Sequence, residues 1–358
     1  MTKITKIFAV IASSLLVSFA SVAGELTVSG SANASYLING GVQNNNGKGI
    51  GISNELKFAA SGELDNGYSW NYHMELDPNG GGTTDNDDTA LTINTGGMGT
   101  IGIFDSEGGL STELGYGIGA IGVGLDYANS MASSGHTAMN WGLDVSSHPN
   151  VQYHLPADIL PLGLGAKVGY APNTGDGDSN SYKNSGATAA QGPTGDALLQ
   201  YQLTAAPIDG LKIGADYFNT DESLTRKQPL QSGNAYAQYA MGNFKVGYNV
   251  GGYSVPLTAK NGAKTRYENE AFGIEFAVND ALTVSYNEEK SEAFTNVAIV
   301  AGASGGVKTS VESDVESWQV AYVMGGATLG LSIADTGNAD YLAGKEEKRT
   351  VFSIAMDF

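Results

Sequence analysis

The sequence predicts an all-β protein, a closed antiparallel transmembrane β-barrel of about 16 strands. Apolar and polar residues alternate with a period of two along most of the chain, which is typical of strands with one face in an apolar medium. Short turns alternate with long polar loops between these strands. After the first residues, no run approaches the roughly 18 apolar residues of a membrane-spanning helix.

The chain begins with the pattern of an export signal. Lys3 and Lys6 form a charged start, an apolar run follows from 7 to 17, and Ser21-Val22-Ala23 is a small-residue cleavage site. The apolar run is shorter than the roughly 20 residues that an anchoring helix needs. We therefore expect residues 1–23 to be a signal peptide and residues 24–358 to form the barrel.

The charge of the chain excludes one class of partner. Of its 18 basic residues, two lie in the predicted signal, which leaves 16 against 37 acidic ones, a formal charge of −21. Nucleic acid is not an expected partner, because phosphate binding needs clustered Lys and Arg. The chain has no cysteine, so it offers neither disulfides nor a thiolate metal site.

The strand pattern is clearest around residues 68–77. Its alternate residues are all apolar and largely aromatic, whereas the residues between them are all polar. The apolar set is Tyr68, Trp70, Tyr72, Met74 and Leu76. The same alternation recurs over 272–278 and 318–324. A soluble β-sandwich would also alternate in this way, so the connections must distinguish the two folds.

The connections favour a membrane barrel. Seven short turns are predicted at 65–67, 96–99, 156–158, 207–210, 241–243, 279–280 and 325–326. Eight long polar loops are predicted near 38–47, 77–88, 105–149, 171–195, 218–231, 252–266, 288–312 and 335–345. This alternation is typical of barrels with short periplasmic turns and long external loops, and it predicts an even number of strands, about 16.

Two segments resemble a known family. The chain ends in an alternating strand, 350–358, with Phe358 at its terminus, as outer-membrane barrels do. The segment from Leu91 to Asp105, with its Gly96-Gly97-Met98-Gly99 turn, resembles strands four and five of the Gram-negative general porins, particularly those of alphaproteobacteria. The resemblance implies that the third loop, 105–149, folds inward and constricts the barrel.

The same resemblance implies a location, partners and a function. It implies an outer-membrane homotrimer in contact with lipid and lipopolysaccharide, through which small hydrophilic solutes and ions diffuse passively. Two alternatives stay open: a substrate-specific channel of the same architecture, and a structural or adhesion barrel that does not conduct. The sequence shows no obvious run of aromatic residues on the inward face, which a sugar-specific channel would need.

A glycine run in the predicted third loop matches a dinucleotide-binding pattern. Gly117, Gly119 and Gly122 have the G-x-G-x-x-G spacing, and Asp144 follows where an acid would bind ribose. The surrounding sequence contains no βαβ unit, and residues 129–135 are poor material for the required helix. We interpret the glycines instead as positions where loop backbone packs closely against the barrel wall.

Strand alternation predicts the charges that line the passage. Over 48–64 and 68–76, the apolar residues face out, so Glu55, Lys57, His73 and Glu75 face in. A three-residue connection with Gly67 in a left-handed conformation places Lys57 opposite Glu75, close enough for an ion pair. Lys167 and Arg349 are predicted on the inner wall as well.

The third loop is predicted to oppose this wall with acidic residues. We expect Asp105, Glu107 and Glu113 to contribute to the constriction. The inward residues of the first strand are Thr, Ser and Asn, so the arginine-rich wall of the family is largely missing. Because excess carboxylates attract cations over roughly 8 Å at physiological salt, we expect a modest preference for cations.

No cofactor or catalytic site is expected. The acidic stretches 84–88 and 175–180 could hold Ca²⁺ or Mg²⁺, although neither completes an EF-hand. The four histidines, His73, His136, His148 and His154, lack a tight metal-binding spacing. No nucleophile motif accompanies the histidines in the loops, so we expect no enzymatic activity.

Overall fold

The computed structural model describes residues 26–42, 46–78, 84–124, 139, 141–156, 159–172, 197–220, 229–254, 264–297 and 307–358. The predicted signal peptide and the acidic stretch 175–180 lie outside these residues. His136 also lies outside them, and the side chains of 84–87 are not described.

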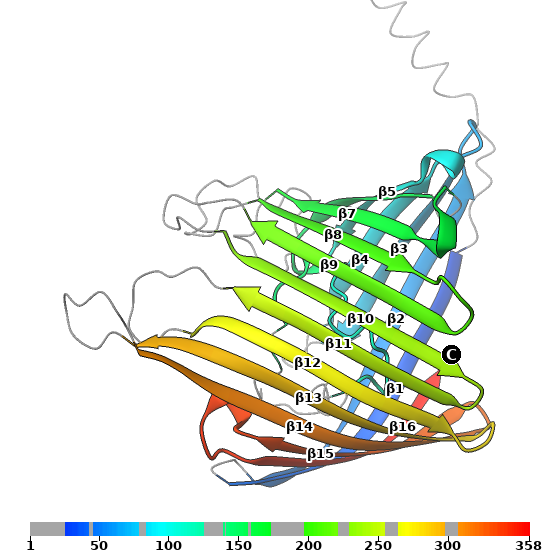
Figure 1. Ribbon diagram of the computed structural model, residues 1–358. Coiled ribbons are helices and arrows are strands. Elements are labelled where there is room, and N and C mark those ends of the chain that lie inside the picture. Colours follow the sequence, from blue (N-terminus) through cyan, green and yellow to red (C-terminus); the bar gives the residue numbers. More distant parts are fainter. Residues whose placement is uncertain are drawn as a thin grey trace, which may run out of the picture.

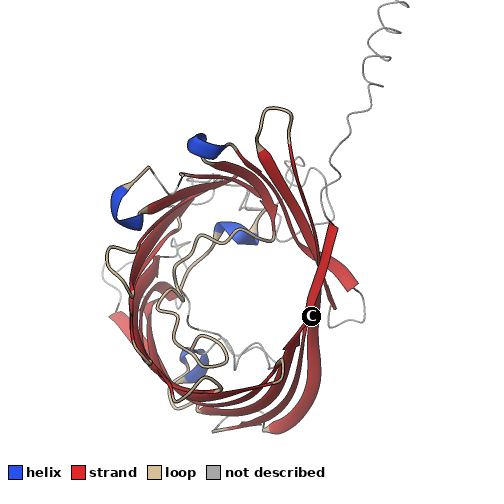
Figure 2. Cartoon of the chain, turned by 90° about the vertical axis from the view of Figure 1, so that its right-hand side faces the viewer, coloured by secondary structure: helices blue, strands red, loops and turns tan. Residues whose placement is uncertain are grey.

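The described residues form a closed barrel of sixteen strands in which each strand pairs with its sequence neighbours, and β1 pairs with β16 (Figures 1 and 2). All pairings are antiparallel. The predicted fold class is therefore confirmed. The strands are β1 (Leu26–Gly40), β2 (Gly47–Glu63), β3 (Ser69–Pro78), β4 (Thr84–Asn94), β5 (Thr100–Asp105), β6 (Asn150–His154), β7 (Gly165–Ala171), β8 (Leu198–Ala205), β9 (Leu211–Thr220), β10 (Gln231–Met241), β11 (Phe244–Ser254), β12 (Lys264–Ala277), β13 (Leu282–Val297), β14 (Val307–Met324), β15 (Ala327–Gly337) and β16 (Glu347–Asp357).

The two ends of the sheet close on each other through β1 and β16. The register runs from Ser31 opposite Asp357 to Gly40 opposite Lys348. At its end, the Gly30 N–H donates to the Phe358 carbonyl at 2.8 Å, and the Phe358 N–H donates to the Gly30 carbonyl at 2.9 Å. The terminal residue thus takes part in closing the barrel, as its position in an alternating last strand predicts.

The β2–β3 hairpin has the predicted register. Lys57 lies directly opposite Glu75 and Phe58 opposite Met74. In the connection, the Leu64 N–H donates to the Tyr68 carbonyl at 2.7 Å. Gly67 adopts a φ of 81°, which is the left-handed conformation that glycine tolerates best.

Six of the seven short connections fall where the turn residues predict them, whereas the connection between β6 and β7 runs from 155 to 164 and is longer than the turn predicted at 156–158. β13 and β14 are also longer than expected. They continue to Val297 and begin at Val307, whereas the pattern assigned 288–312 to a loop. Acidic and basic residues stand on both faces in this stretch, which removes the apolar signal. Strand pairing nevertheless continues from Glu288 opposite Glu316 to Val297 opposite Val307.

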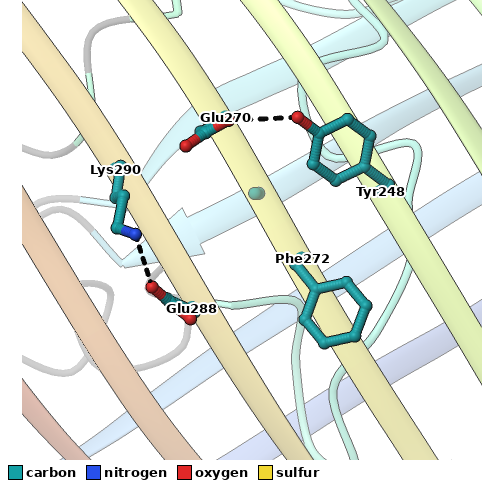
Figure 3. Close-up of a pocket in the computed structure, with 6 residues that line it drawn as sticks. Tyr248, Glu270, Phe272, Glu288 and Lys290 are labelled. Carbon is teal, nitrogen blue, oxygen red and sulfur yellow. Dashed lines mark hydrogen bonds and ion pairs between the residues drawn. The ribbon is translucent and has the colours of Figure 1, made fainter.

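The outer face of the barrel is apolar. Large side chains point outward along its strands, and Ile50 and Trp318 are 86% and 60% exposed. Toward the loop ends of β11 to β13 this face becomes charged. There Tyr248, Glu270, Phe272, Glu288 and Lys290 line a shallow pocket of about 110 Å³ (Figure 3). Among the residues described, no helix is long and apolar enough to cross a membrane.

The inner face of the barrel is polar. Hydrophobic clusters lie on this face where loop residues pack against the wall. Gln200, Asn249 and Gln319 point inward and are buried. Three hydrophobic clusters lie on this face and include loop residues such as Tyr116, Leu110 and Tyr341. The main core of this protein therefore lies between the loops and the wall.

We predict that a charge on the outer face destabilises the barrel. Ile274 lies on that face between Val246 and Tyr286. The substitution Ile274→Arg should lower the free energy of unfolding by about 2 to 4 kcal/mol, the range seen near a bilayer midplane. The measurement is equilibrium unfolding of the protein in phospholipid vesicles. Ile274→Leu, which changes shape without charge, should cost less than about 1.5 kcal/mol. Equal effects of the two substitutions would contradict a lipid-facing position.

Candidate functional site

The long connection between β5 and β6 follows the inner wall of the barrel. Its backbone N–H groups donate to wall side chains: Thr112 to Asp216 at 2.7 Å, and Ile121 to Gln319 at 3.0 Å. On the returning arm, the Val145 N–H donates to Gln200 at 2.7 Å. Loop segments are visible inside the ring of strands in Figure 2. The wall thus supplies the acceptors that a strand partner would otherwise provide.

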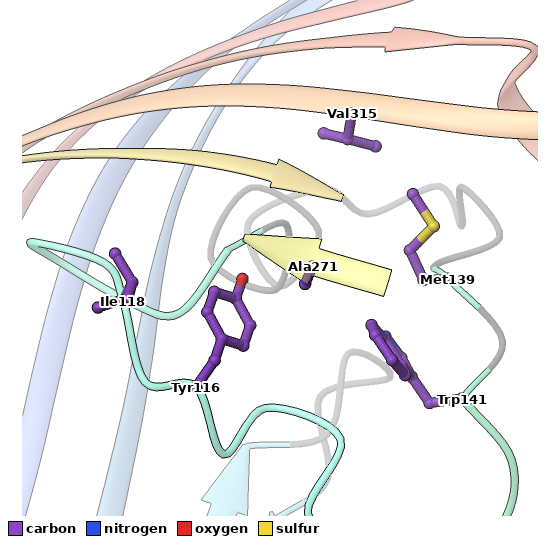
Figure 4. Packing of buried hydrophobic residues seen from close by; sticks show 6 residues of the cluster. All are labelled: Tyr116, Ile118, Met139, Trp141, Ala271 and Val315. Atoms are coloured by element: carbon purple, nitrogen blue, oxygen red, sulfur yellow. The ribbon is translucent and has the colours of Figure 1, made fainter. Parts of the chain in front are cut away.

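Apolar side chains of this loop fit against glycines of the wall. Ile118 is fully buried, and a Cβ added at Gly273 on β12 would lie 2.6 Å from the Ile118 Cβ. Tyr116 is also fully buried, and its hydroxyl donates to Glu289 at 2.7 Å. Figure 4 shows Tyr116, Ile118, Met139 and Trp141 from the loop gathered with Ala271 and Val315 from the wall. The small wall residues therefore make room for the loop.

The glycine run serves this close packing. A Cβ added at Gly115 would lie 2.1 Å from the Tyr236 ring on β10. Asp144, the residue that matched a ribose-binding acid, instead joins the two arms of the loop. It accepts hydrogen bonds from the backbone N–H groups of Leu110 and Ser146, both at 3.0 Å, and from that of Ser111. This arrangement agrees with the packing interpretation, and no βαβ unit surrounds the run in the described chain.

Four predicted aperture residues come together where the loop leaves β5. Lys57 on β2 forms an ion pair with Glu75 on β3, as the predicted register requires. His73, two residues before Glu75, contacts Glu107 of the loop through Nε2. The side chains of Lys57, His73 and Glu107 stay partly exposed, at 32%, 21% and 27%, whereas Glu75 is buried.

Carboxylates outnumber cations around this group. Glu55 on β2 is repelled by Glu75 and Asp77, while Lys57 is attracted by Glu55, Glu75 and Glu107. The one ammonium of Lys57 thus faces three carboxylates, and Asp77 adds a fourth near Glu55. We call the six residues Glu55, Lys57, His73, Glu75, Asp77 and Glu107 the acidic cluster.

The other predicted loop acids lie elsewhere. Asp105 is the last residue of β5, opposite Thr89, and in strand alternation it shares the face of the outward Ile101 and Ile103. Its register therefore does not support a place in the aperture. Glu113 is half-buried and accepts a hydrogen bond from the Ser111 hydroxyl at 3.3 Å.

The predicted basic residues of the wall differ in how far they are exposed and paired. Lys167 is half-buried on the inner face of β7, opposite His154 and Gln202. Arg349 points inward from β16 but is only 3% exposed, and it donates to Glu347 at 2.8 Å. A buried, paired guanidinium does not line an open passage. Lys245 on β11 forms an ion pair with Glu275 at 2.9 Å and donates to the Gly117 carbonyl at 3.1 Å.

Two features escaped prediction from the sequence. The contact between His73 and Glu107 joins residues 34 positions apart, and only the alternation that turns His73 inward hinted at it.

An inward row of aromatic rings, which the pattern did not reveal, also crosses several elements. It comprises Phe218, Tyr253, Tyr267 and Tyr341, with neighbouring ring centroids 5.4 to 6.4 Å apart. Phe218, Tyr267 and Tyr341 are buried, so the row packs loops and does not offer a stacking surface for sugars.

Comparison with known proteins gives one family and one fold. The profile of a family described as Gram-negative porin matches residues 9–340. No curated protein matches the chain. Three similar solved structures are the trimer form of OmpT from Vibrio cholerae (12% identity, TM-score 0.62), OmpF from Salmonella typhi in complex with daunomycin (11%, 0.60) and an anion-selective porin from Comamonas acidovorans (12%, 0.62). Each covers 94% of this chain, and the match spans 100%, 98% and 100% of the respective structures.

We predict that Asp216 holds the loop to the wall. It accepts hydrogen bonds from both the N–H and the hydroxyl of Thr112, each at 2.7 Å, and both residues are buried. Asp216→Ala leaves two buried donors unsatisfied, which should cost about 1 to 3 kcal/mol and should increase cleavage of the loop in limited proteolysis. Asp209→Ala, an exposed change in the β8–β9 turn, is the matched control. Unchanged loop protection in Asp216→Ala would contradict this role.

Proposed function

The chain belongs to the Gram-negative porin family, and we propose that it forms a water-filled pore for passive diffusion of small hydrophilic solutes and ions. Its family and barrel architecture locate the protein in the outer membrane. The narrower resemblance to alphaproteobacterial porins stays a prediction.

The observation that carries the proposal is the solvent exposure of charged side chains inside the barrel. Lys57 and Glu107 belong to the inner wall and its loop, yet their side chains are 32% and 27% exposed. An unpaired or partly paired charge in a dry interior would be strongly unfavourable. A barrel whose interior keeps charges accessible to water at the level of the loop is suited to conduct ions.

We assign the constriction to the loop 105–149. Its described residues follow the wall from β8 to β14, bonded to Gln200, Asp216, Ser285 and Gln319. A loop held along one side reduces the cross-section left to solutes. The remaining passage is then bounded by the loop and by the β2–β3 wall, where the acidic cluster stands.

We propose a modest preference for cations. Lys57, Lys245 and Arg349 each form an ion pair with a wall carboxylate, which weakens their attraction for anions. The acidic cluster retains an excess of carboxylates. The barrel fold alone does not determine selectivity, because a solved structure with the same fold is titled an anion-selective porin. Selectivity therefore depends on where the charges stand.

We further propose that the protein is a homotrimer in contact with lipid and lipopolysaccharide. A similar solved structure is described as a trimer form. The apolar outer face, with charged residues toward the loop ends of β12 and β13, suits a lipid environment bounded by polar headgroups. Small hydrophilic solutes and ions are the expected cargo, and neither nucleic acid nor a catalysed reaction is expected.

Single-channel recording in a planar bilayer tests the proposal against its two alternatives. A general pore should show an ohmic conductance that neutral solutes do not saturate or block. A substrate-specific channel would show block by one class of solute. A structural or adhesion barrel would give no conductance steps under conditions where the folded protein inserts.

We predict that Glu107 contributes to cation preference. In Glu107→Gln, the ratio of cation to anion permeability should fall by about twofold, because a unit charge one Debye length away changes the energy of a monovalent ion in water by about a third of RT, with opposite sign for cations and anions. The ratio follows from the reversal potential in a salt gradient. Glu288→Gln removes the same charge from the outer face and is the matched control. Anion preference in the unmodified protein would overturn the charge argument.

A further inference from the structure

We propose that His73, Glu75 and Glu107 bind a divalent first-row transition-metal ion, for which Zn²⁺ is the probe. Among the residues described, these three are the one group of His, Cys, Asp or Glu whose ligand atoms all lie within 4.8 Å of one another. They meet where β3 faces the loop that follows β5. The inference deepens the proposed pore, since it places a binding site beside the passage.

The geometry of the three ligands follows from the fold. His73 and Glu75 are two residues apart on β3, so both side chains project from the inner face. Glu107 is the second residue after β5 ends, and it reaches them from the start of the loop. His73 Nε2 already contacts Glu107 Oε2. An ion bound here would therefore link the loop directly to the wall.

The donor set favours a transition metal over Ca²⁺ or Mg²⁺. One imidazole nitrogen and two carboxylate oxygens suit Zn²⁺, which accepts N and O ligands and often keeps a fourth position for water. Ca²⁺ takes six to eight oxygen ligands, and Mg²⁺ prefers near-octahedral oxygen coordination. An imidazole ligand suits neither ion.

The surrounding charge is a separate argument for a cation. Lys57 is the one lysine or arginine of the acidic cluster, and the carboxylates of Glu55, Glu75 and Glu107 attract it, while Asp77 lies near enough to Glu55 to repel its carboxylate. Lys57 pairs with Oε1 of Glu75, and Glu55 also approaches this carboxylate, so a metal ion would share the Glu75 carboxylate with Lys57 and displace Glu55. A divalent ion would offset two of the excess negative charges at a place where they repel one another.

Binding should also change conduction. A bound ion would reduce the negative charge of the acidic cluster and restrain the start of the loop at the narrow part of the proposed pore. We therefore expect Zn²⁺ at micromolar concentrations to reduce conductance and cation preference together. This consequence depends on the proposed channel function, whereas binding itself does not.

Binding is measured by isothermal titration of ZnCl₂ into the purified, detergent-solubilised full chain. We expect one site per chain, with affinity at least about 10-fold weaker in His73→Gln and in Glu107→Gln, since even residues that only support metal ligands contribute 10- to 100-fold. His154→Gln is the matched control, because His154 also faces inward but bonds to Gln152 at 2.8 Å, outside the cluster. MgCl₂ and CaCl₂ titrations should show much weaker binding.

Conductance supplies an independent measurement, with each variant compared with itself before and after Zn²⁺. Block of the unmodified protein and of His154→Gln, with no block of His73→Gln, would support the site. Equal Zn²⁺ affinity in all proteins, or binding of Ca²⁺ as tight as that of Zn²⁺, would overturn it. Zinc binding that depends on His73 in a protein that never conducts would support the site and overturn the channel function instead.

Discussion

The structure depends on one constraint: each backbone N–H and C=O group of a membrane-spanning sheet must find its partner within the protein. An open sheet leaves two edges unsatisfied, and closure of β1 on β16 removes both. The reciprocal hydrogen bonds between Gly30 and the terminal Phe358 complete this closure. Because the outer face must be apolar where it meets lipid, the polar residues of the strands at that level are turned toward the interior.

The polar inner face and apolar outer face determine how the long loop between β5 and β6 is held. In a soluble protein a loop packs on an apolar core, but here it meets a polar wall. Its backbone donors are accepted by Asp216, Gln319 and Gln200, and its apolar residues Tyr116 and Ile118 enter places where the wall has glycine or alanine. Hydrogen bonds thus hold the backbone while a small apolar cluster holds the side chains. The two kinds of contact define the course of the described parts of the loop along the wall.

Charge inside the barrel follows from the same geometry. Cross-strand neighbours on the inner face lie close enough to pair, and Lys57 with Glu75 and Lys245 with Glu275 do so. Pairing reduces the field of the basic residues and leaves the carboxylates in excess around His73 and Glu107. Any preference for cations and any affinity for a metal ion therefore have one common physical origin, in the acidic cluster.

The sequence by itself determined the strands, the short turns, the inward and outward faces and the β2–β3 register, because a period of two and turn residues such as Gly67 are local signals. It also brought Lys57 to Glu75 correctly. Only the tertiary structure decided that His73 meets Glu107, that Arg349 is buried beside Glu347, and how far β13 and β14 extend. These features depend on the course of a loop along a wall formed by distant strands, such as Thr112 against Asp216, and no local periodicity encodes contacts between residues so far apart in the chain.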